Sequence, residues 1–165
     1  MVLAAPMTVV LLLCVLLATT CLGLVWRRRN GRMRDVAGGG VARGVGSAGG
    51  DRDDGTIDPA VLASLGVTPA AAPVTLVQFS SAFCQPCRAT RRVLDQVTEM
   101  LPEVCHVEVD AESHLDAVRA LGVLRTPTVL VLDRRGRVVR RASGQPRRAD
   151  VIAAVAPLLT DSQPG

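Results

Sequence analysis

Two cysteines separated by two residues form the part of the chain best suited to chemistry. Cys84 and Cys87 enclose Gln85 and Pro86 in a Cys-x-x-Cys unit. Such a pair can cycle between a dithiol and a disulfide, because one thiolate attacks a foreign disulfide and the second thiol then resolves the mixed disulfide. The pattern therefore predicts thiol–disulfide exchange, with Cys87 close enough to attack a mixed disulfide formed at Cys84.

A zinc site and a purely structural disulfide are the alternatives for this pair. Structural zinc usually needs a second ligand pair, and Cys105, His106 and His114 form no such spaced motif. A structural bridge over a two-residue loop restrains little of the unfolded chain. We therefore interpret the pair as a redox-active disulfide that works without a metal or another cofactor.

The flanking sequence predicts where the cysteines lie. The apolar, β-branched segment Val74–Phe79 is typical of a buried strand, and from Arg88 onward apolar residues recur at helical spacing. The pair thus lies where a strand turns into a helix, and Pro86 suits the first helical turn. A thiolate at a helix N-terminus is stabilised by unpaired N–H groups and the helix dipole, so we expect Cys84 to ionise more readily than free cysteine.

A second motif lies before another apolar strand. Thr126-Pro127 lies just before the predicted strand Val129–Leu132, and a proline at this place marks a strand start, a sheet edge or a cis bond. A Cys-x-x-Cys unit followed by this Thr-Pro resembles the thioredoxin family over about residues 76–159. The resemblance implies a thioredoxin-like α/β fold, in which helices flank a central mixed sheet.

The resemblance also implies roles for individual residues. Cys84 corresponds to the attacking cysteine and Cys87 to the resolving one. Thr126 and Pro127 correspond to the cis-proline segment that holds the substrate backbone beside the sulfurs. Phe83 stands where the family commonly has tryptophan, and we expect it to contact substrate.

Three further residues are expected to modulate the chemistry. Pro86 lies between the cysteines beside Gln85, which replaces the family's usual glycine. Gln78 occupies the place of the family's buried aspartate, the group credited with proton handling for the resolving cysteine. Because glutamine cannot exchange a proton at neutral pH, rate, pH dependence or reduction potential should differ from those of standard thioredoxins.

The N-terminal segment is apolar. Thr8–Trp26 is a run of 19 uncharged residues, which as a helix can cross a hydrocarbon core of about 30 Å. Residues 1–26 are therefore predicted to be a single-pass transmembrane anchor in the cell membrane. Five arginines lie between Arg27 and Arg34, and the positive-inside rule then places the domain in the cytoplasm.

Two regions follow the anchor. Residues 27–55, rich in glycine and arginine, are predicted to be a flexible tether, and residues 56–165 the thioredoxin-like domain. The domain's first helix begins at Asp58, an N-cap residue followed by proline. Its remaining elements are expected in the order strand, helix, strand, helix, strand, strand, helix.

Composition limits the possible partners. All 19 basic residues are arginine, which indicates the coding bias of a GC-rich bacterium more than a surface for binding nucleic acid. Two phenylalanines and one tryptophan also offer few rings on which bases could stack. No nucleotide-binding glycine motif is present, so electrons must come from a separate donor, such as a thioredoxin reductase-like protein or another thiol donor.

The predicted function is reduction of protein disulfides at the membrane. Extracytoplasmic thiol–disulfide exchange, of the disulfide-forming or cytochrome c maturation type, and a redox-silent binding module remain open alternatives.

Overall fold

The computed structural model describes residues 4–29, 31–36 and 55–161. The chain divides into two compact units, residues 1–30 and 31–165. The first unit contains helix α1 (Ala4–Arg29), in which the side chains of residues 9–25 are exposed. Within the described part of the chain, no helix combines the length and the apolar character needed to span a membrane, so the predicted transmembrane anchor is not supported.

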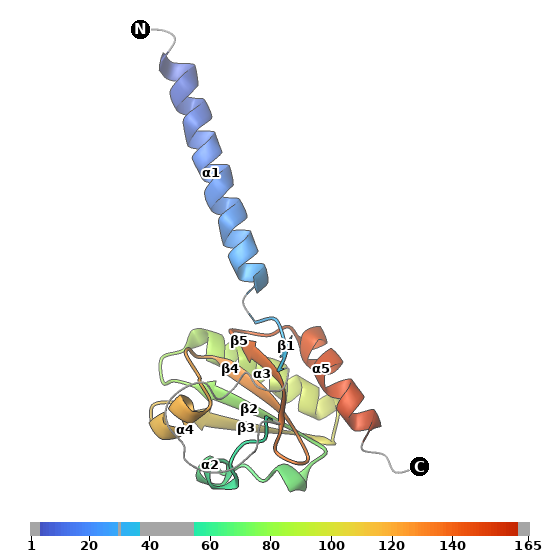
Figure 1. The fold of residues 1–165 in the computed structure, drawn as a ribbon. Helices are drawn as coiled ribbons and strands as arrows, with labels where there is room; N and C mark the ends of the chain where they lie inside the picture. Colours follow the sequence, from blue (N-terminus) through green and yellow to red (C-terminus); the bar gives the residue numbers. More distant parts are fainter. Residues whose placement is uncertain (1–3, 30, 37–54, 162–165) are drawn as a thin grey trace. The chain divides into compact units, whose positions relative to one another are not determined.

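The second unit is built on a mixed five-stranded sheet with the strand order β1-β5-β4-β2-β3 (Figure 1). Strand β2 pairs in parallel with β3, and the other neighbours are antiparallel. The strands are β1 (Arg34–Asp35), β2 (Val74–Ser80), β3 (Val104–Asp110), β4 (Thr128–Asp133) and β5 (Val138–Ser143).

Helices cover both faces of this sheet and give the unit two hydrophobic cores. On one face, α3 (Gln85–Met100) and α5 (Arg148–Thr160) pack on the sheet, and this core includes Leu76, Leu94 and Val155. On the other face lie α2 (Pro59–Ser64), the 3-10 turn η1 (Pro69–Ala71) and α4 (Leu115–Ala120). Phe79 and Leu130 are fully buried in that second core. The predicted α/β fold with a central mixed sheet between helices is confirmed.

The predicted order of helices and strands is also confirmed from α2 to α5. Asp58 is the N-cap of α2, since its Oδ1 accepts a hydrogen bond from the amide of Ala60 at 2.8 Å, and Pro59 follows at the first helical position. Strand β1 was not predicted. It lies near the start of the segment that we interpreted as a tether, and residues 37–54 of that segment lie outside the described residues.

Candidate active site

The two cysteines are joined by a disulfide at the N-terminus of α3. The Sγ atoms of Cys84 and Cys87 are 1.98 Å apart, and the Cα atoms 5.2 Å. Strand β2 ends at Ser80 and α3 begins at Gln85, so the pair lies at the predicted junction of strand and helix. Pro86 lies in the first turn of α3, where its missing N–H would have had no helical partner.

The two sulfur positions differ in their access to solvent. Cys87 is 2% exposed, whereas Cys84 is only half-buried. Cys84 is the N-cap residue of α3, and its Sγ accepts a hydrogen bond from the backbone amide of Cys87 at 3.1 Å. That amide would also stabilise a thiolate at Cys84, because charge-assisted bonds to helix N-terminal amides favour the anion. The geometry thus gives one accessible sulfur suited to attack and one shielded sulfur behind it.

A cis-proline loop approaches the segment that carries the disulfide. The Thr126-Pro127 peptide bond is cis, as the resemblance implies. The hydroxyls of Thr126 and Ser81 form a hydrogen bond of 3.0 Å, which joins this loop to the residues just before Cys84. On its other side, Pro127 O accepts from the amide of Gly144 at 2.7 Å. The loop is therefore fixed to both β2 and β5.

An arginine on β5 anchors the chain that leads into this loop. Arg141 donates from Nη1 to Leu121 O at 2.8 Å and from Nη2 to Gly122 O at 2.5 Å. These carbonyls terminate α4, where a cation is favoured by the helix dipole. Burial lowers the pKa of the Arg141 guanidinium from its ordinary value, yet an arginine remains charged in proteins. Arg141 thus acts as the C-terminal cap of α4.

The remaining predicted site residues lie around the disulfide in two groups. Phe83 and Gln85 are exposed beside the cysteines, and the Phe83 side chain is 97% exposed. Gln78 lies on the opposite, inner side, where it is completely buried and donates from Nε2 to Cys87 O at 3.1 Å. The structure therefore brings Gln78 directly behind the resolving cysteine.

The loops and the helix that carry the disulfide and the cis-proline expose apolar and basic side chains. Leu124, in the loop that leads to the cis-proline, is 95% exposed, much like Phe83. Arg88, Arg91 and Arg92 on α3 are exposed as well. Large apolar side chains left in solvent on adjoining loops are typical of a surface that contacts another protein.

Sequence reasoning missed four side chains of this region, namely Ser80, Ser81, Glu108 and Arg141. Ser80 and Gln78 share a face of β2 by simple alternation, which could have linked them. Glu108 stands opposite Gln78 only in the register of the parallel β2–β3 pair, which a single sequence does not reveal. The other two act through loops whose approach depends on the whole fold.

The other candidate ligands do not assemble into a metal centre. Among the residues that the structure describes, no three side chains of His, Cys, Asp or Glu are grouped so that they could hold a metal ion. His106 packs with only 9% of its side chain exposed, and its Nδ1 lies 3.1 Å from Asp95 Oδ1. Cys14, Cys21 and Cys105 are free and exposed.

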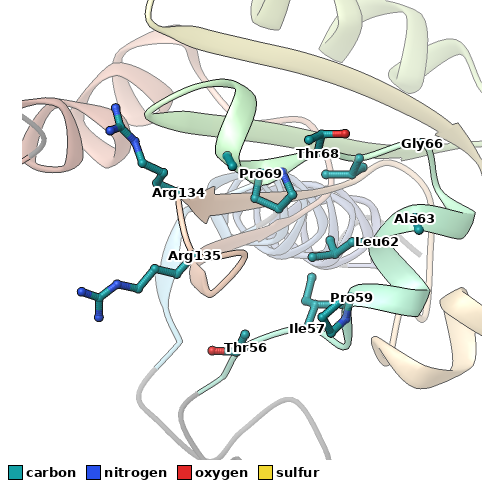
Figure 2. Close-up of a pocket in the computed structure, with 12 residues that line it drawn as sticks. Thr56, Ile57, Pro59, Leu62, Ala63, Gly66, Thr68, Pro69, Arg134 and Arg135 are labelled. Atoms are coloured by element: carbon teal, nitrogen blue, oxygen red, sulfur yellow. The ribbon is translucent and has the colours of Figure 1, made fainter.

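A pocket of about 470 Å³ lies elsewhere in the domain (Figure 2). Its lining includes Leu62 and Pro69, and the side chains of Arg134 and Arg135 extend outward from its margin in Figure 2. These arginines follow the end of β4, whereas the cis-proline precedes its start. Because a strand advances about 3.3 Å per residue, the pocket is far from the disulfide, and we place the active site at the disulfide instead.

Comparisons with known proteins agree with this geometry. The family model described as thioredoxin matches residues 67–157. A chloroplastic thioredoxin z is 25% identical, with a TM-score of 0.52 over 59% of this chain and 89% of that chain. A mutant thioredoxin from Halobacterium salinarum NRC-1 is 19% identical, with a TM-score of 0.52 over 55% of this chain and 79% of that chain. A search of the curated proteins gives no match.

Proposed function

The chain belongs to the thioredoxin family, and from this premise we propose that it reduces disulfide bonds in proteins by dithiol–disulfide exchange. The observation that carries the proposal is the unequal pair at the N-terminus of α3. Cys84 is half-buried and caps the helix, whereas Cys87 is 2% exposed behind it. The sulfur of Cys84 can therefore contact a large substrate, while the sulfur of Cys87 is shielded and reacts only in the second step.

The reaction begins from the reduced dithiol. The Cys84 thiolate attacks one sulfur of the substrate disulfide, which forms a mixed disulfide and expels the first substrate thiolate. Cys87 then loses its proton and attacks Cys84 Sγ, which releases the second substrate thiolate and forms the Cys84–Cys87 disulfide seen here. Two electrons pass from the cysteine pair to the substrate, and the released thiolates take up protons from water.

Substrate docking is proposed for the surface around the cis-proline. The hydrogen bond between Ser81 and Thr126 holds together the two loops that carry the exposed side chains of Phe83 and Leu124. An unfolded or extended segment next to a cystine could cover these apolar side chains while its backbone lies along Pro127. The proposed substrates are therefore proteins with accessible disulfides, and a separate thiol donor must return the pair to the dithiol.

A turbidity assay of insulin reduction with dithiothreitol as donor tests this function. We expect the wild-type chain to accelerate insulin reduction and Cys84→Ser to fall to the rate of dithiothreitol alone. Arg119→Met serves as a matched surface control, because Arg119 lies on α4 in an exposed ion pair with Asp116. Equal rates for wild type and Cys84→Ser would instead support a redox-silent binding module.

We also propose a location, namely the cytoplasmic side of a membrane with helix α1 as the attachment. Its support is the row of exposed apolar side chains at residues 9–25, followed by the arginines from Arg27 to Arg34. Labelling of Cys84 with a membrane-impermeant maleimide after mild reduction checks it, with Cys84→Ser as the control. Labelling only in permeabilised cells is expected, and labelling in intact cells would favour extracytoplasmic exchange.

A further inference from the structure

A chain of polar side chains lies behind the disulfide, between β2, β3 and α3. Gln78 Nε2 donates to Cys87 O at 3.1 Å, to Ser80 Oγ at 2.7 Å and to Glu108 Oε1 at 3.2 Å. The Ser80 hydroxyl donates to the same Glu108 oxygen at 2.6 Å. Arg91 on α3 pairs with the other carboxylate oxygen at 2.5 Å. Hydrogen bonds therefore connect the backbone carbonyl of Cys87 to one carboxylate through a single intervening side chain.

The second step of the proposed reaction needs a proton acceptor at this place. Cys87 must lose its proton to attack the mixed disulfide, and at 2% exposure it has little access to bulk water. Burial disfavours the free thiolate, so a nearby base should accelerate the step. Gln78 contacts Cys87 but has no basic group.

We propose that Glu108 is the proton acceptor for Cys87, held in place by Gln78 and Ser80. Within the described part of the chain, no other carboxylate is hydrogen-bonded to a side chain that contacts Cys87. The Glu108 side chain is 24% exposed, so it can pass the proton on to solvent. This inference rests on the proposed function and adds a residue to its second step.

An unpartnered atom supplies independent support for the path. Gln78 Oε1 is buried and receives no hydrogen bond from the described residues, although its amide nitrogen is fully engaged. A buried acceptor of this kind is commonly satisfied by a water molecule. In the proposed path, a water on Gln78 Oε1 takes the proton from Cys87 Sγ and passes one to Glu108.

The charges around Glu108 are compatible with this role. Arg91 places one positive charge beside the Glu108 carboxylate. Along the same face of β3, His106 pairs with Asp95 of α3, and Asp110 is hydrogen-bonded within its own turn. From β2 only the uncharged side chains of Gln78 and Ser80 approach Glu108. Arg91 is therefore the single cation in direct contact with this carboxylate within the described residues.

The two chemical steps can be timed separately with dithionitrobenzoate, a small aromatic disulfide. Attack by Cys84 releases one coloured thiolate, and attack by Cys87 on the mixed disulfide releases the second. The experiment uses the full chain, reduced beforehand, with serine in place of the three free cysteines, Cys14, Cys21 and Cys105. Stopped-flow absorbance then gives one rate constant for each release.

Glu108→Gln is the main variant, because it keeps the shape and removes the base. General base catalysis contributes about 10²–10⁴-fold, so we expect Glu108→Gln to slow the second release by at least about tenfold at pH 7 and to leave the first release unchanged. The difference between the second-release rate constants of this variant and of wild type should decrease as the pH rises, since hydroxide then replaces the missing base. Asp95→Asn, a matched change on the neighbouring turn of α3, should leave both phases within about twofold of wild type.

A rescue separates proton transfer from a structural effect. Gln78→Asp in the Glu108→Gln background returns a carboxylate to the side of Cys87, and we expect it to restore most of the lost rate. A second phase in Glu108→Gln within twofold of wild type, an equal loss in Asp95→Asn, or no rescue would each overturn the proposal.

Wild type alone gives a further test if Glu108→Gln does not fold. A second phase whose rate constant rises tenfold for every pH unit from 7 to 9 would show that hydroxide, and not a protein base, takes the proton. We expect a shallower rise. Absence of the first phase would instead refute the proposed function itself.

Discussion

Replacing Arg141 by methionine should destabilise the domain and weaken its activity. The change removes two charge-assisted hydrogen bonds to Leu121 O and Gly122 O while it keeps much of the apolar stem. Hydrogen bonds to charged groups contribute about 1.5–3 kcal/mol each when both partners are buried. Here Gly122 is exposed and Arg141 only half-buried, so water can replace part of the loss. We therefore expect a decrease of about 2 kcal/mol in the free energy of unfolding.

Urea unfolding measures this change. With an m value of about 1.5 kcal/mol/M, the midpoint should fall by about 1.3 M. Arg119→Met is the control, because the Arg119–Asp116 pair is exposed at 73% and 103% and should contribute less than about 0.5 kcal/mol. Insulin reduction should decrease as well, since the anchored carbonyls lead into the cis-proline loop. If Arg141→Met and Arg119→Met lose stability equally, the role of Arg141 as a helix cap is refuted.

Three further outcomes are expected. Cys87→Ser should accumulate a mixed disulfide between Cys84 and substrate. This species should appear as a band on non-reducing gels that dithiothreitol removes, and absence of the band would contradict the assigned order of attack. Leu94→Ala should cost about 3 kcal/mol in urea unfolding, because Leu94 is fully buried between α3 and the sheet. The pKa of Asp110 is lowered from its ordinary value of 3.8, mainly by the hydrogen bond from the Ser113 hydroxyl. The ionised Asp110 should therefore stabilise the fold above pH 3.8, and this contribution should be lost as the pH falls through the lowered pKa. Asp110→Asn should then match wild type in acid unfolding experiments but be less stable at pH 7.

Local sequence signals predicted much of this structure. Asp58 before a proline gave the start of α2, and the change from an alternating to a helical pattern placed the cysteines at the end of β2. The Thr126-Pro127 pair was correctly associated with a cis bond, through the family resemblance. These features depend on neighbouring residues, which a single sequence displays directly.

Features that depend on tertiary register were not predicted. Glu108 is an ordinary polar residue of a strand until β3 is aligned with β2, which places it opposite Gln78. Arg141 lies on strand β5, and its link to the end of α4 joins residues that are twenty apart in the sequence. The sequence shows that glutamine replaces the family's aspartate at position 78. That Ser80 and Glu108 surround Gln78 follows only from the folded structure.

The residues on either side of positions 37–54, in the glycine-rich part of the chain, are both paired with strand β5. Before these positions, the amide of Val36 donates to Val139 O at 3.3 Å, and after them the amide of Val138 donates to Gly55 O at 3.1 Å. The described residues on either side of positions 37–54, Val36 and Gly55, are therefore both hydrogen-bonded to strand β5. Because both flanking residues are held on the same strand, we expect insertions between them to leave the attachment of residues 31–36 to the domain unchanged. Doubling the number of residues between Val36 and Gly55 would cost only about 0.6 kcal/mol in closure entropy.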